Sequence, residues 1–296
     1  MKPAIAIIGG GPAGISAAIQ LKRYNLDPVL FEEAQIGGLL KNAWRVENLP
    51  NSPAGVSGRQ IIERFKGNLE IFRINIINQR VINLDYQYDK FLITTADNIY
   101  DCDIAIIATG TIPIRHSLEK SAPENIRQKI FYEIFPIGMA VDKNVLVVGA
   151  GDAAFDYSLN LAQQNRATIL NRSNQIKALP SLQKLVRDNR SIDYLENSEI
   201  EQIRLSGEDR LSVLINKEND KITLEVDNIL FAIGRIEQKE FYSKNLTPIE
   251  YNLMKRGLLF LIGDIKNGIF RQASIAIGDG IKCAMEIYHN LNSGRK

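Results

Sequence analysis

The sequence predicts an α/β protein with two parallel-sheet domains. A glycine-rich turn between a short apolar run and a segment of helical periodicity occurs twice, beginning at Gly9 and at Gly149. Each copy is followed by another short apolar run, so each closes a strand–helix–strand unit, and such units place their strands in parallel. A chain of 296 residues is long enough to bury a core around each copy. We therefore expect two Rossmann-like dinucleotide-binding domains.

The first unit begins with Ala4–Ile8, a continuous apolar run that predicts a strand. Ile15–Leu21 carries apolar residues at helical spacing, and Val29–Phe31 is a second apolar run. The turn between strand and helix reads Gly9-Gly10-Gly11-Pro12-Ala13-Gly14. This order of strand, turn, helix and strand predicts a phosphate-binding turn at the start of the helix.

Each glycine of the first turn has a predicted role. Gly9 permits the tight turn, Gly11 removes the side chain that would block a pyrophosphate, and Gly14 lets helix and strand pack closely. Glu32 ends the second strand, about twenty residues further on, where a carboxylate can accept hydrogen bonds from a ribose. The first turn is therefore predicted to bind a dinucleotide.

The second unit repeats this order. Val145–Val148 predicts a strand, Phe155–Gln163 a helix and Ala167–Leu170 the following strand. The turn between strand and helix carries Gly149, Gly151 and Ala154, and alanine at the third position still permits close packing.

The second site favours NADPH over NADH. The strand after its helix ends in Asn171-Arg172, without the acid that would bind an adenosine ribose. Arg172 and Lys177 are cations that can pair with a 2′-phosphate.

The segments between the glycine turns predict further strands. Ile74–Ile82 and Phe91–Thr95 are predicted to pair antiparallel around a polar turn at Asp85–Lys90, and Ile203–Val226 forms a comparable hairpin. An apolar strand closes each half, one ending in Ala108-Thr109-Gly110 and the other in Gly234-Arg235.

Bulk properties exclude several classes of protein. The net charge of +2 arises from interspersed acids and bases, which argues against a nucleic-acid-binding surface. No apolar run is long enough to span a membrane, and a strand beginning at Ala4 leaves no room for a secretion signal, so we expect a cytoplasmic protein. The only cysteines are Cys102 and Cys283, which predicts neither a disulfide framework nor a zinc site, and no other metal site is predicted.

The chain resembles the low-molecular-weight thioredoxin reductase group of flavoproteins, the class II pyridine nucleotide-disulfide oxidoreductases. The matching motifs are the two glycine turns, Gly37-Gly38-Leu39 with Val46-Glu47-Asn48, Ala108-Thr109-Gly110, and Gly263-Asp264 followed by Arg271-Gln272-Ala273 and Gly278-Asp279-Gly280. The resemblance implies bound FAD, a nicotinamide dinucleotide as electron donor, and a homodimer. The chain is predicted to cross between its two halves near Thr111–Ile114 and again near Gln238–Pro248. These crossings predict an FAD-binding domain formed by residues 1–111 and 245–296, with the NAD(P)-binding domain at 112–244 inserted between them.

Motifs and resemblance together predict the cofactor-binding residues. Those expected at FAD are Gly9, Gly11, Pro12, Ala13, Gly14, Glu32, Glu33, Gly38, Leu39, Asn48, Ala108, Thr109, Gly110, Gly263, Asp264, Arg271, Gln272 and Ala273. Those expected at the nicotinamide dinucleotide are Gly149, Gly151, Asp152, Ala154, Arg172, Lys177, Gly234 and Arg235. No catalytic residue is predicted, because hydride transfer to a flavin requires alignment rather than a general base.

The sequence departs from the family where a redox dithiol would stand. Thioredoxin reductases of this group carry a Cys-x-x-Cys pair shortly before the second glycine turn, and counting back from Gly149 puts its positions at about Tyr132 and Phe135. A dithiol relay needs two adjacent sulfurs. We therefore expect an FAD-dependent NAD(P)H oxidoreductase that is not itself a thioredoxin reductase.

Two interpretations of the electron acceptor follow. Phe131–Asp142 resembles the ferredoxin or flavodoxin NADP reductases of the same fold, so a small redox protein ranks first as acceptor. A small disulfide, a quinone or oxygen ranks next. The other interpretation is a flavin-binding regulatory subunit without turnover.

Overall fold

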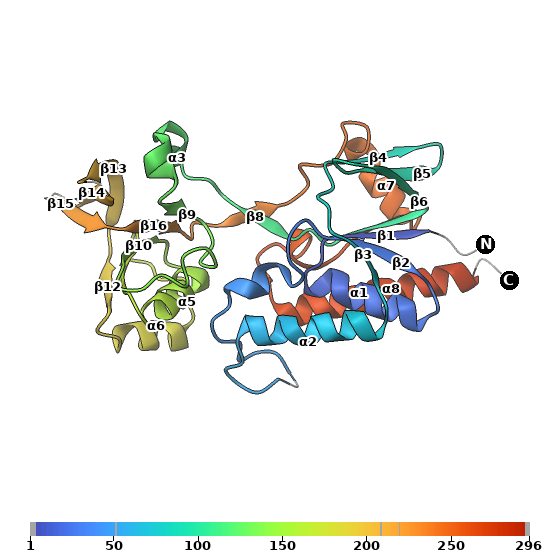
Figure 1. The fold of residues 1–296 in the computed structure, drawn as a ribbon, viewed down its shortest axis with the longest axis horizontal. Helices are drawn as coiled ribbons and strands as arrows, with labels where there is room; N and C mark the ends of the chain where they lie inside the picture. Colours follow the sequence, from blue (N-terminus) through green and yellow to red (C-terminus); the bar gives the residue numbers. More distant parts are fainter. Residues whose placement is uncertain (1–3, 51, 208, 219, 294–296) are drawn as a thin grey trace. The chain divides into compact units, whose positions relative to one another are not determined.

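The computed structural model describes residues 4–50, 52–207, 209–218 and 220–293. The chain forms two compact units (Figure 1). Unit 1 contains Met1–Lys41, Arg45–Ile112 and Ile236–Lys296, and unit 2 contains Asn42–Trp44 and Pro113–Arg235.

The second crossing between the units therefore lies earlier than the predicted Asn245. The segment after Ile236 is held in unit 1, because the Leu84 N–H donates to the Phe241 carbonyl and the Ser243 hydroxyl donates to Asp85. The two crossing segments pair with each other as β8 (Thr111–Pro113) and β17 (Arg235–Glu237).

Unit 1 is built on a five-stranded parallel sheet. Its strand order is β18-β7-β1-β2-β3. The strands are β1 (Ile5–Ile8), β2 (Pro28–Phe31), β3 (Asn75–Ile77), β7 (Ile104–Ile107) and β18 (Leu259–Leu261). Strands buried on both faces have continuous apolar sequences, as β1 and β7 do.

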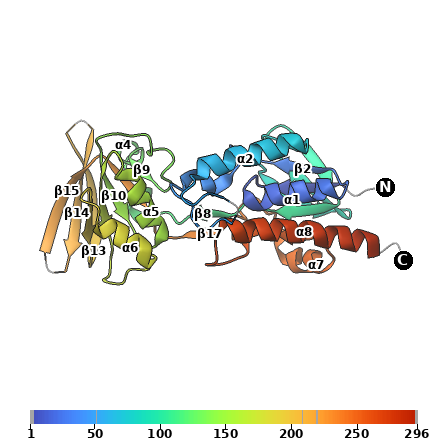
Figure 2. The same ribbon diagram turned by 90° about the horizontal axis from the view of Figure 1, so that it is seen from below.

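Different layers cover the two faces of this sheet. Helices α1 (Pro12–Arg23), α2 (Gly58–Ile71) and α8 (Ala273–Ser293) lie on one face, where Ile5 and Ile7 join their core (Figures 1 and 2). The neighbouring residues of β1, Ala6 and Ile8, point to the other face, as the period of a strand requires. That face packs against a smaller antiparallel sheet and the helix α7 (Glu250–Lys255).

The smaller sheet corrects one predicted pairing. Its order is β4-β5-β6, with β4 at Asn83–Gln87, β5 at Lys90–Thr94 and β6 at Ile99–Cys102. Only the last residue of the segment Ile74–Ile82 meets β5, where the Ile82 N–H donates to the Thr94 carbonyl at 2.8 Å. Its strand β3 runs parallel to β2 at the edge of the main sheet, and β5 pairs with β4 instead. Apolar content alone did not distinguish an edge strand from a hairpin strand.

Unit 2 repeats the same layering. Its parallel sheet has the order β12-β11-β10-β16-β9. The strands are β9 (Ile130–Phe131), β10 (Asn144–Val148), β11 (Arg166–Leu170), β12 (Ile192–Leu195) and β16 (Asn228–Phe231). Helices α5 (Asp152–Leu161) and α6 (Pro180–Arg187) cover one face.

An antiparallel sheet covers the other face of unit 2. It contains β13 (Ser198–Ser206), β14 (Arg210–Lys217) and β15 (Asp220–Val226), so the predicted hairpin is a three-stranded meander. Two short helices, α3 (Ser117–Ser121) and α4 (Glu124–Arg127), contribute Leu118 and Ile126 to the same core.

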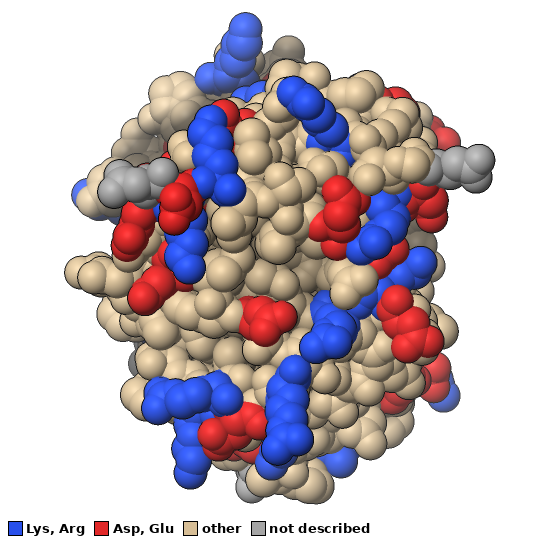
Figure 3. All heavy atoms as spheres, turned by 90° about the vertical axis from the view of Figure 1, so that its left-hand side faces the viewer, with Lys and Arg blue, Asp and Glu red and all other residues tan. Residues whose placement is uncertain are grey.

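Within the described residues, the fold also contains the short 3₁₀ helices η1 (Gly38–Asn42), η2 (Thr247–Ile249) and η3 (Gly263–Ile265). Among the described residues, no helix is both long enough and apolar enough to cross a membrane. The face in Figure 3 carries basic and acidic side chains interspersed.

Candidate dinucleotide sites

The first glycine turn joins β1 to α1, and two of its glycines are required by packing. Gly9 has a φ of +109°, and a Cβ built there would lie 2.4 Å from the Ala108 carbonyl oxygen. A Cβ on Gly14 would lie 2.0 Å from the Gly9 carbonyl oxygen. Because both contacts are with backbone, neither position can accept a side chain without moving β7 or α1.

Gly11 differs from Gly9 and Gly14 because no neighbouring atom occupies the space where a side chain would lie. A Cβ built there meets nothing within 4 Å, and Gly11 is the N-cap of α1 with no capping side chain. Gly38 lies beside it, since a Cβ on Gly38 would be 3.2 Å from the Gly11 Cα, and the Gly37 N–H donates to the Gly10 carbonyl at 2.8 Å. The open position at a helix N-terminus fits a pyrophosphate.

Glu32 lies at the carboxyl end of β2, beside this turn. One oxygen of its carboxylate accepts from the Gly10 N–H at 2.7 Å, and the other accepts from the Ala34 N–H at 3.0 Å. Glu33, also predicted at the site, is exposed and pairs with Arg80 at 3.4 Å. The structure therefore ties Glu32, rather than Glu33, to the glycine turn.

The C-terminal motifs lie against the first turns of α1. Gly263 has a φ of +73°, and a Cβ there would be 2.9 Å from the Ala13 Cβ. Asp279, on α8, accepts from the Gly263 N–H at 3.0 Å and so fixes the turn that carries the half-buried Asp264. A Cβ on Gly280 would lie 2.2 Å from the Ala13 carbonyl oxygen, so Gly280 permits the close packing of α8 on α1.

Two further predicted groups come together within unit 1. The Asn48 side-chain amide donates to the Gln272 side chain, and the Ser274 hydroxyl donates to the Asn48 carbonyl at 3.1 Å, where α8 begins. The Thr109 hydroxyl donates to the Gln238 carbonyl at 2.8 Å. Each of these contacts joins segments far apart in the sequence. Of the remaining predicted residues, Pro12 begins α1, Leu39 is in η1, Gly110 has a positive φ, and Arg271 is half-buried before Ala273.

The second glycine turn has the same construction in unit 2. Gly149 has a φ of +139°, and a Cβ there would lie 2.4 Å from the Ala232 carbonyl oxygen. Gly151 is the N-cap of α5 without a capping side chain, and a Cβ there meets nothing within 4 Å. Ala154 is buried under the turn. Gly151 therefore leaves the same open space as Gly11.

The segment 171–179 packs beside the second turn. The Lys177 N–H donates to the Ala150 carbonyl at 2.8 Å, and Asp152 accepts from the Leu179 N–H at 2.8 Å. Arg172 and Lys177 are both exposed. Two candidate phosphate-binding cations therefore lie on a segment that is attached to the glycine turn.

Asn171 organises this segment, a role that the sequence did not reveal. Its side-chain amide donates to the Gln175 carbonyl at 3.0 Å and to the Tyr194 hydroxyl at 2.8 Å. Its side-chain carbonyl accepts from the Ser173 N–H at 3.2 Å. The residue that replaces the ribose-binding acid is therefore buried and shapes the turn that presents Arg172.

A half-buried polar cluster lies where β9 and β16 end. Arg235 forms a 2.5 Å ion pair with Glu133, whose other oxygen accepts from the Asn42 side chain and, at 3.4 Å, from the Tyr157 hydroxyl. Burial also raises the pKa of Asp156, on α5, to about 6, although the Trp44 N–H donates to it. Arg235 was predicted at the site, whereas the pairing of Glu133 with it was not.

The two thiols are buried in separate cores. Cys102 belongs to the core between the two sheets of unit 1, and Cys283 to the core under α1 and α8. Burial raises the pKa of Cys102 to about 12 and the pKa of Cys283 well above its usual range. Both are therefore protonated at neutral pH and unsuited to attack a disulfide.

The residues at the predicted dithiol positions have structural contacts. Tyr132 is buried, stacks on Phe231, and donates its hydroxyl to Glu119 at 2.7 Å. The Phe135 N–H donates to the Asn42 side chain at 3.2 Å. Neither side chain carries a sulfur that could form a disulfide.

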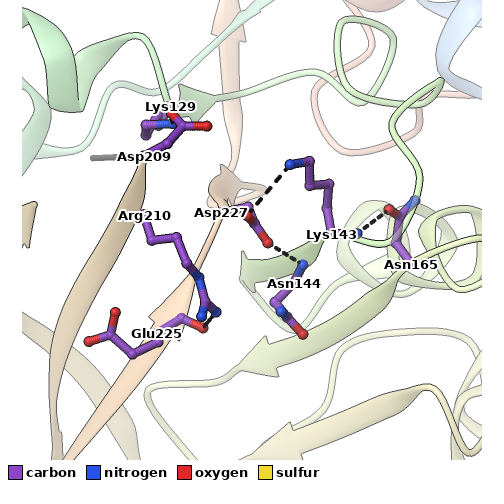
Figure 4. A network of polar contacts seen from close by, with 8 residues as sticks. All are labelled: Lys129, Lys143, Asn144, Asn165, Asp209, Arg210, Glu225 and Asp227. Atoms are coloured by element: carbon purple, nitrogen blue, oxygen red, sulfur yellow. Dashed lines mark hydrogen bonds and ion pairs between the residues drawn. The ribbon is translucent and has the colours of Figure 1, made fainter. Parts of the chain in front are cut away.

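Another polar network lies at the amino-terminal ends of the strands of unit 2, opposite the glycine turn (Figure 4). Asp227 accepts from the Asn144 N–H at 2.7 Å and pairs with Lys143 at 3.7 Å, where β10 and β16 begin. The Lys143 N–H donates to Asn165 at 2.9 Å. Dinucleotides bind at the carboxyl ends of parallel strands, so this network supports the sheet rather than a ligand.

Two parallel-sheet units, each with a glycine turn at the start of a helix, are typical of a dinucleotide-binding flavoprotein of the oxidoreductase class. The chain belongs to the pyridine nucleotide-disulphide oxidoreductase family, which it matches over residues 3–280. It is 29% identical over 304 residues to a thioredoxin reductase of Chlamydia trachomatis serovar D, with 95% of this chain and 96% of that protein covered.

Solved structures share the fold. The Lactococcus lactis thioredoxin reductase in its FR conformation superposes with a TM-score of 0.88 at 23% identity, covering 99% of this chain and 100% of that one. The bacillithiol disulfide reductase Bdr of Staphylococcus aureus has a TM-score of 0.71 at 20% identity, with both chains covered completely. The predicted fold class is thereby confirmed, and enzymes of the thioredoxin reductase type use FAD and NADPH.

Proposed function

We propose that this protein is an FAD-dependent NADPH oxidoreductase whose flavin passes its electrons to an external acceptor, with no dithiol of the chain as intermediate. The observation that carries the proposal is the pair of open positions at Gly11 and Gly151, each at an uncapped helix N-terminus above a parallel sheet. Each can receive a pyrophosphate. Electron transfer from NADPH to a flavin requires two bound dinucleotides, NADPH and FAD, and the chain offers one such position for each.

Unit 1 is the proposed site of FAD. Gly11 and the N-terminus of α1 would hold the pyrophosphate, and Glu32 would accept hydrogen bonds from the adenosine ribose. Asp264, Gln272 and the N-terminus of α8 would lie towards the flavin end, where a helix N-terminus favours negative charge on the reduced ring. Bound FAD would supply a two-electron carrier that can accept a hydride from NADPH and give up two electrons and a proton.

Unit 2 is the proposed site of NADPH. Gly151 and α5 would hold its pyrophosphate, while Arg172 and Lys177 would pair with the 2′-phosphate. An acid at position 171 would repel that phosphate, but Asn171 is neutral and its side chain is used within the turn. This arrangement favours NADPH over NADH.

The acceptor is proposed to be a small redox protein of the ferredoxin or flavodoxin type. The support is the burial of both thiols, in different cores, which leaves the chain no pair of sulfurs to relay electrons to a disulfide. A small disulfide, a quinone or oxygen is the alternative.

An anaerobic titration tests the proposal. The purified, FAD-loaded protein is mixed with NADPH, and the visible flavin absorbance is followed; we expect it to bleach, and to bleach more slowly with NADH. Ferredoxin, flavodoxin, thioredoxin, a quinone and a small disulfide are then added separately. We expect ferredoxin or flavodoxin to restore the absorbance fastest. A flavin that neither nucleotide bleaches would contradict the enzyme assignment and favour a flavin-binding subunit without turnover.

A further inference from the structure

The strand order of unit 2 indicates over which strands the adenosine half and the nicotinamide half of a bound dinucleotide would lie. In the order β12-β11-β10-β16-β9, the strands that follow β10 in the chain lie on both sides of it, so the switch point falls between β10 and β16. The adenosine end lies over β11, because the ribose-binding position follows the second strand of the unit. The nicotinamide half must then extend over the ends of β16 and β9.

One residue that follows each of these two strands in the chain takes part in an ion pair with the other. Glu133 follows β9 and Arg235 follows β16, and their side chains are joined by the 2.5 Å contact. Each side chain is only about one fifth exposed, at 23% and 20%. Removing one partner of such a pair costs more than removing an exposed surface charge.

Three neighbours fix the Glu133 carboxylate. One of its oxygens accepts from Arg235, and the other from the amide of Asn42 and the hydroxyl of Tyr157. Asn42 and Tyr157 are themselves buried. The carboxylate thus has little freedom, and the guanidinium that it binds is held in one place.

We infer that Glu133 is a positioning residue for the nicotinamide half of NADPH. It holds the Arg235 guanidinium at the carboxyl ends of β9 and β16, where the cation faces the phosphate and ribose nearest the nicotinamide. This inference rests on the proposed binding of NADPH to unit 2. It also gives the segment between Tyr132 and Phe135 a binding function, where thioredoxin reductases carry their dithiol.

Binding of a fragment separates this role from a structural one. Adenosine 2′,5′-bisphosphate carries the adenosine and the 2′-phosphate but lacks the nicotinamide half. Its dissociation constant and that of NADPH are measured by calorimetry on the FAD-loaded protein and on Glu133→Gln. We expect Glu133→Gln to weaken NADPH binding about tenfold, the effect of losing one charged hydrogen bond, and to change fragment binding less than twofold.

Matched variants complete the test. Arg235→Gln should give the same selective loss, and the double variant no further loss, because the two residues act as one unit. Arg172→Ala should weaken both ligands. Equal weakening of both ligands in Glu133→Gln, or of neither, would overturn the inference while leaving the proposed function intact. Failure of the unaltered protein to bind either ligand would overturn the proposed function, and the inference with it.

Discussion

Gly11→Val should empty the flavin site while leaving the fold in place. Gly11 has an extended backbone, with φ −77° and ψ −178°, which valine adopts without strain. A Cβ at this position meets nothing within 4 Å. The cost to folding is therefore limited to a poorer N-cap, about 1 kcal/mol.

The cost to FAD binding should be larger. A valine side chain would occupy the space where the pyrophosphate approaches the N-terminus of α1, and it would prevent charge-assisted hydrogen bonds from the helix N–H groups. The loss of two such bonds, at about 2 kcal/mol each, weakens binding by roughly a thousandfold. The assay is the dissociation constant of FAD for the apoprotein, together with the melting temperature of the apoprotein.

Two glycine substitutions serve as controls. Gly67→Val places a side chain in equally open space on α2, away from the turn, and should retain FAD. Gly14→Ala places a Cβ 2.0 Å from the Gly9 carbonyl oxygen and should destabilise unit 1 itself by about 2 kcal/mol or more. If Gly11→Val keeps the unaltered affinity for FAD, the assignment of this turn to the pyrophosphate is wrong.

Three further predictions concern single side chains. Arg172→Ala should raise the KM for NADPH about tenfold and that for NADH less than twofold, with the exposed Arg187→Ala as control; equal effects would make Arg172 an ordinary surface charge. Replacing both Cys102 and Cys283 by alanine should leave the rate of acceptor reduction within about twofold, since these thiols are protonated, and a lost activity would reveal a thiol relay. Native Asp156 keeps its proton up to about pH 6, above the ordinary 3.8, so the free energy of unfolding of unit 2 should fall as pH rises between these values. Asp156→Asn should flatten that fall and stabilise the unit at neutral pH by about 2 kcal/mol, measured by urea titration of Trp44 fluorescence; an unchanged pH dependence would contradict the burial of this carboxyl.

The parallel-sheet elements could be predicted from sequence because their signals are local. A continuous apolar run, a glycine turn and a helical period fall within a few residues of each other, and β1, α1 and β2 lie where these signals put them. The pairing of β4 with β5 is a local hairpin closed at Gln87 and Lys90, but β4 was missed because its polar residues from Asp85 onward were assigned to the turn. β3 has the apolar composition of a hairpin strand but pairs with β2.

The candidate sites divide in the same way. Gly9, Gly11 and Gly14 could be recognised because the tight turn, the open phosphate position and the close helix packing each require glycine, and they recur at a fixed spacing. The polar partners could not be recognised, since Asp279 reaches Gly263 across 16 positions of the chain and Glu133 reaches Arg235 across 102. Such pairs carry no periodicity. They become visible only when the fold brings the carboxyl ends of the strands together.

The burial of the thiols and the Glu133 pair together bear on how electrons leave this protein. A flavoprotein that passes electrons to a disulfide through cysteines of its own chain needs a thiolate close to the flavin. Here the two thiols are protonated and lie in separate cores. In the segment where such a dithiol would stand, the chain has instead built an ion pair fixed by Asn42 and Tyr157. A half-buried ion pair is costly to maintain unless hydrogen bonds satisfy its charged atoms, as the bonds from Asn42 and Tyr157 do for Glu133. On the proposed binding of NADPH to unit 2, this segment serves nucleotide binding, and the proposed acceptor has to reach the flavin directly.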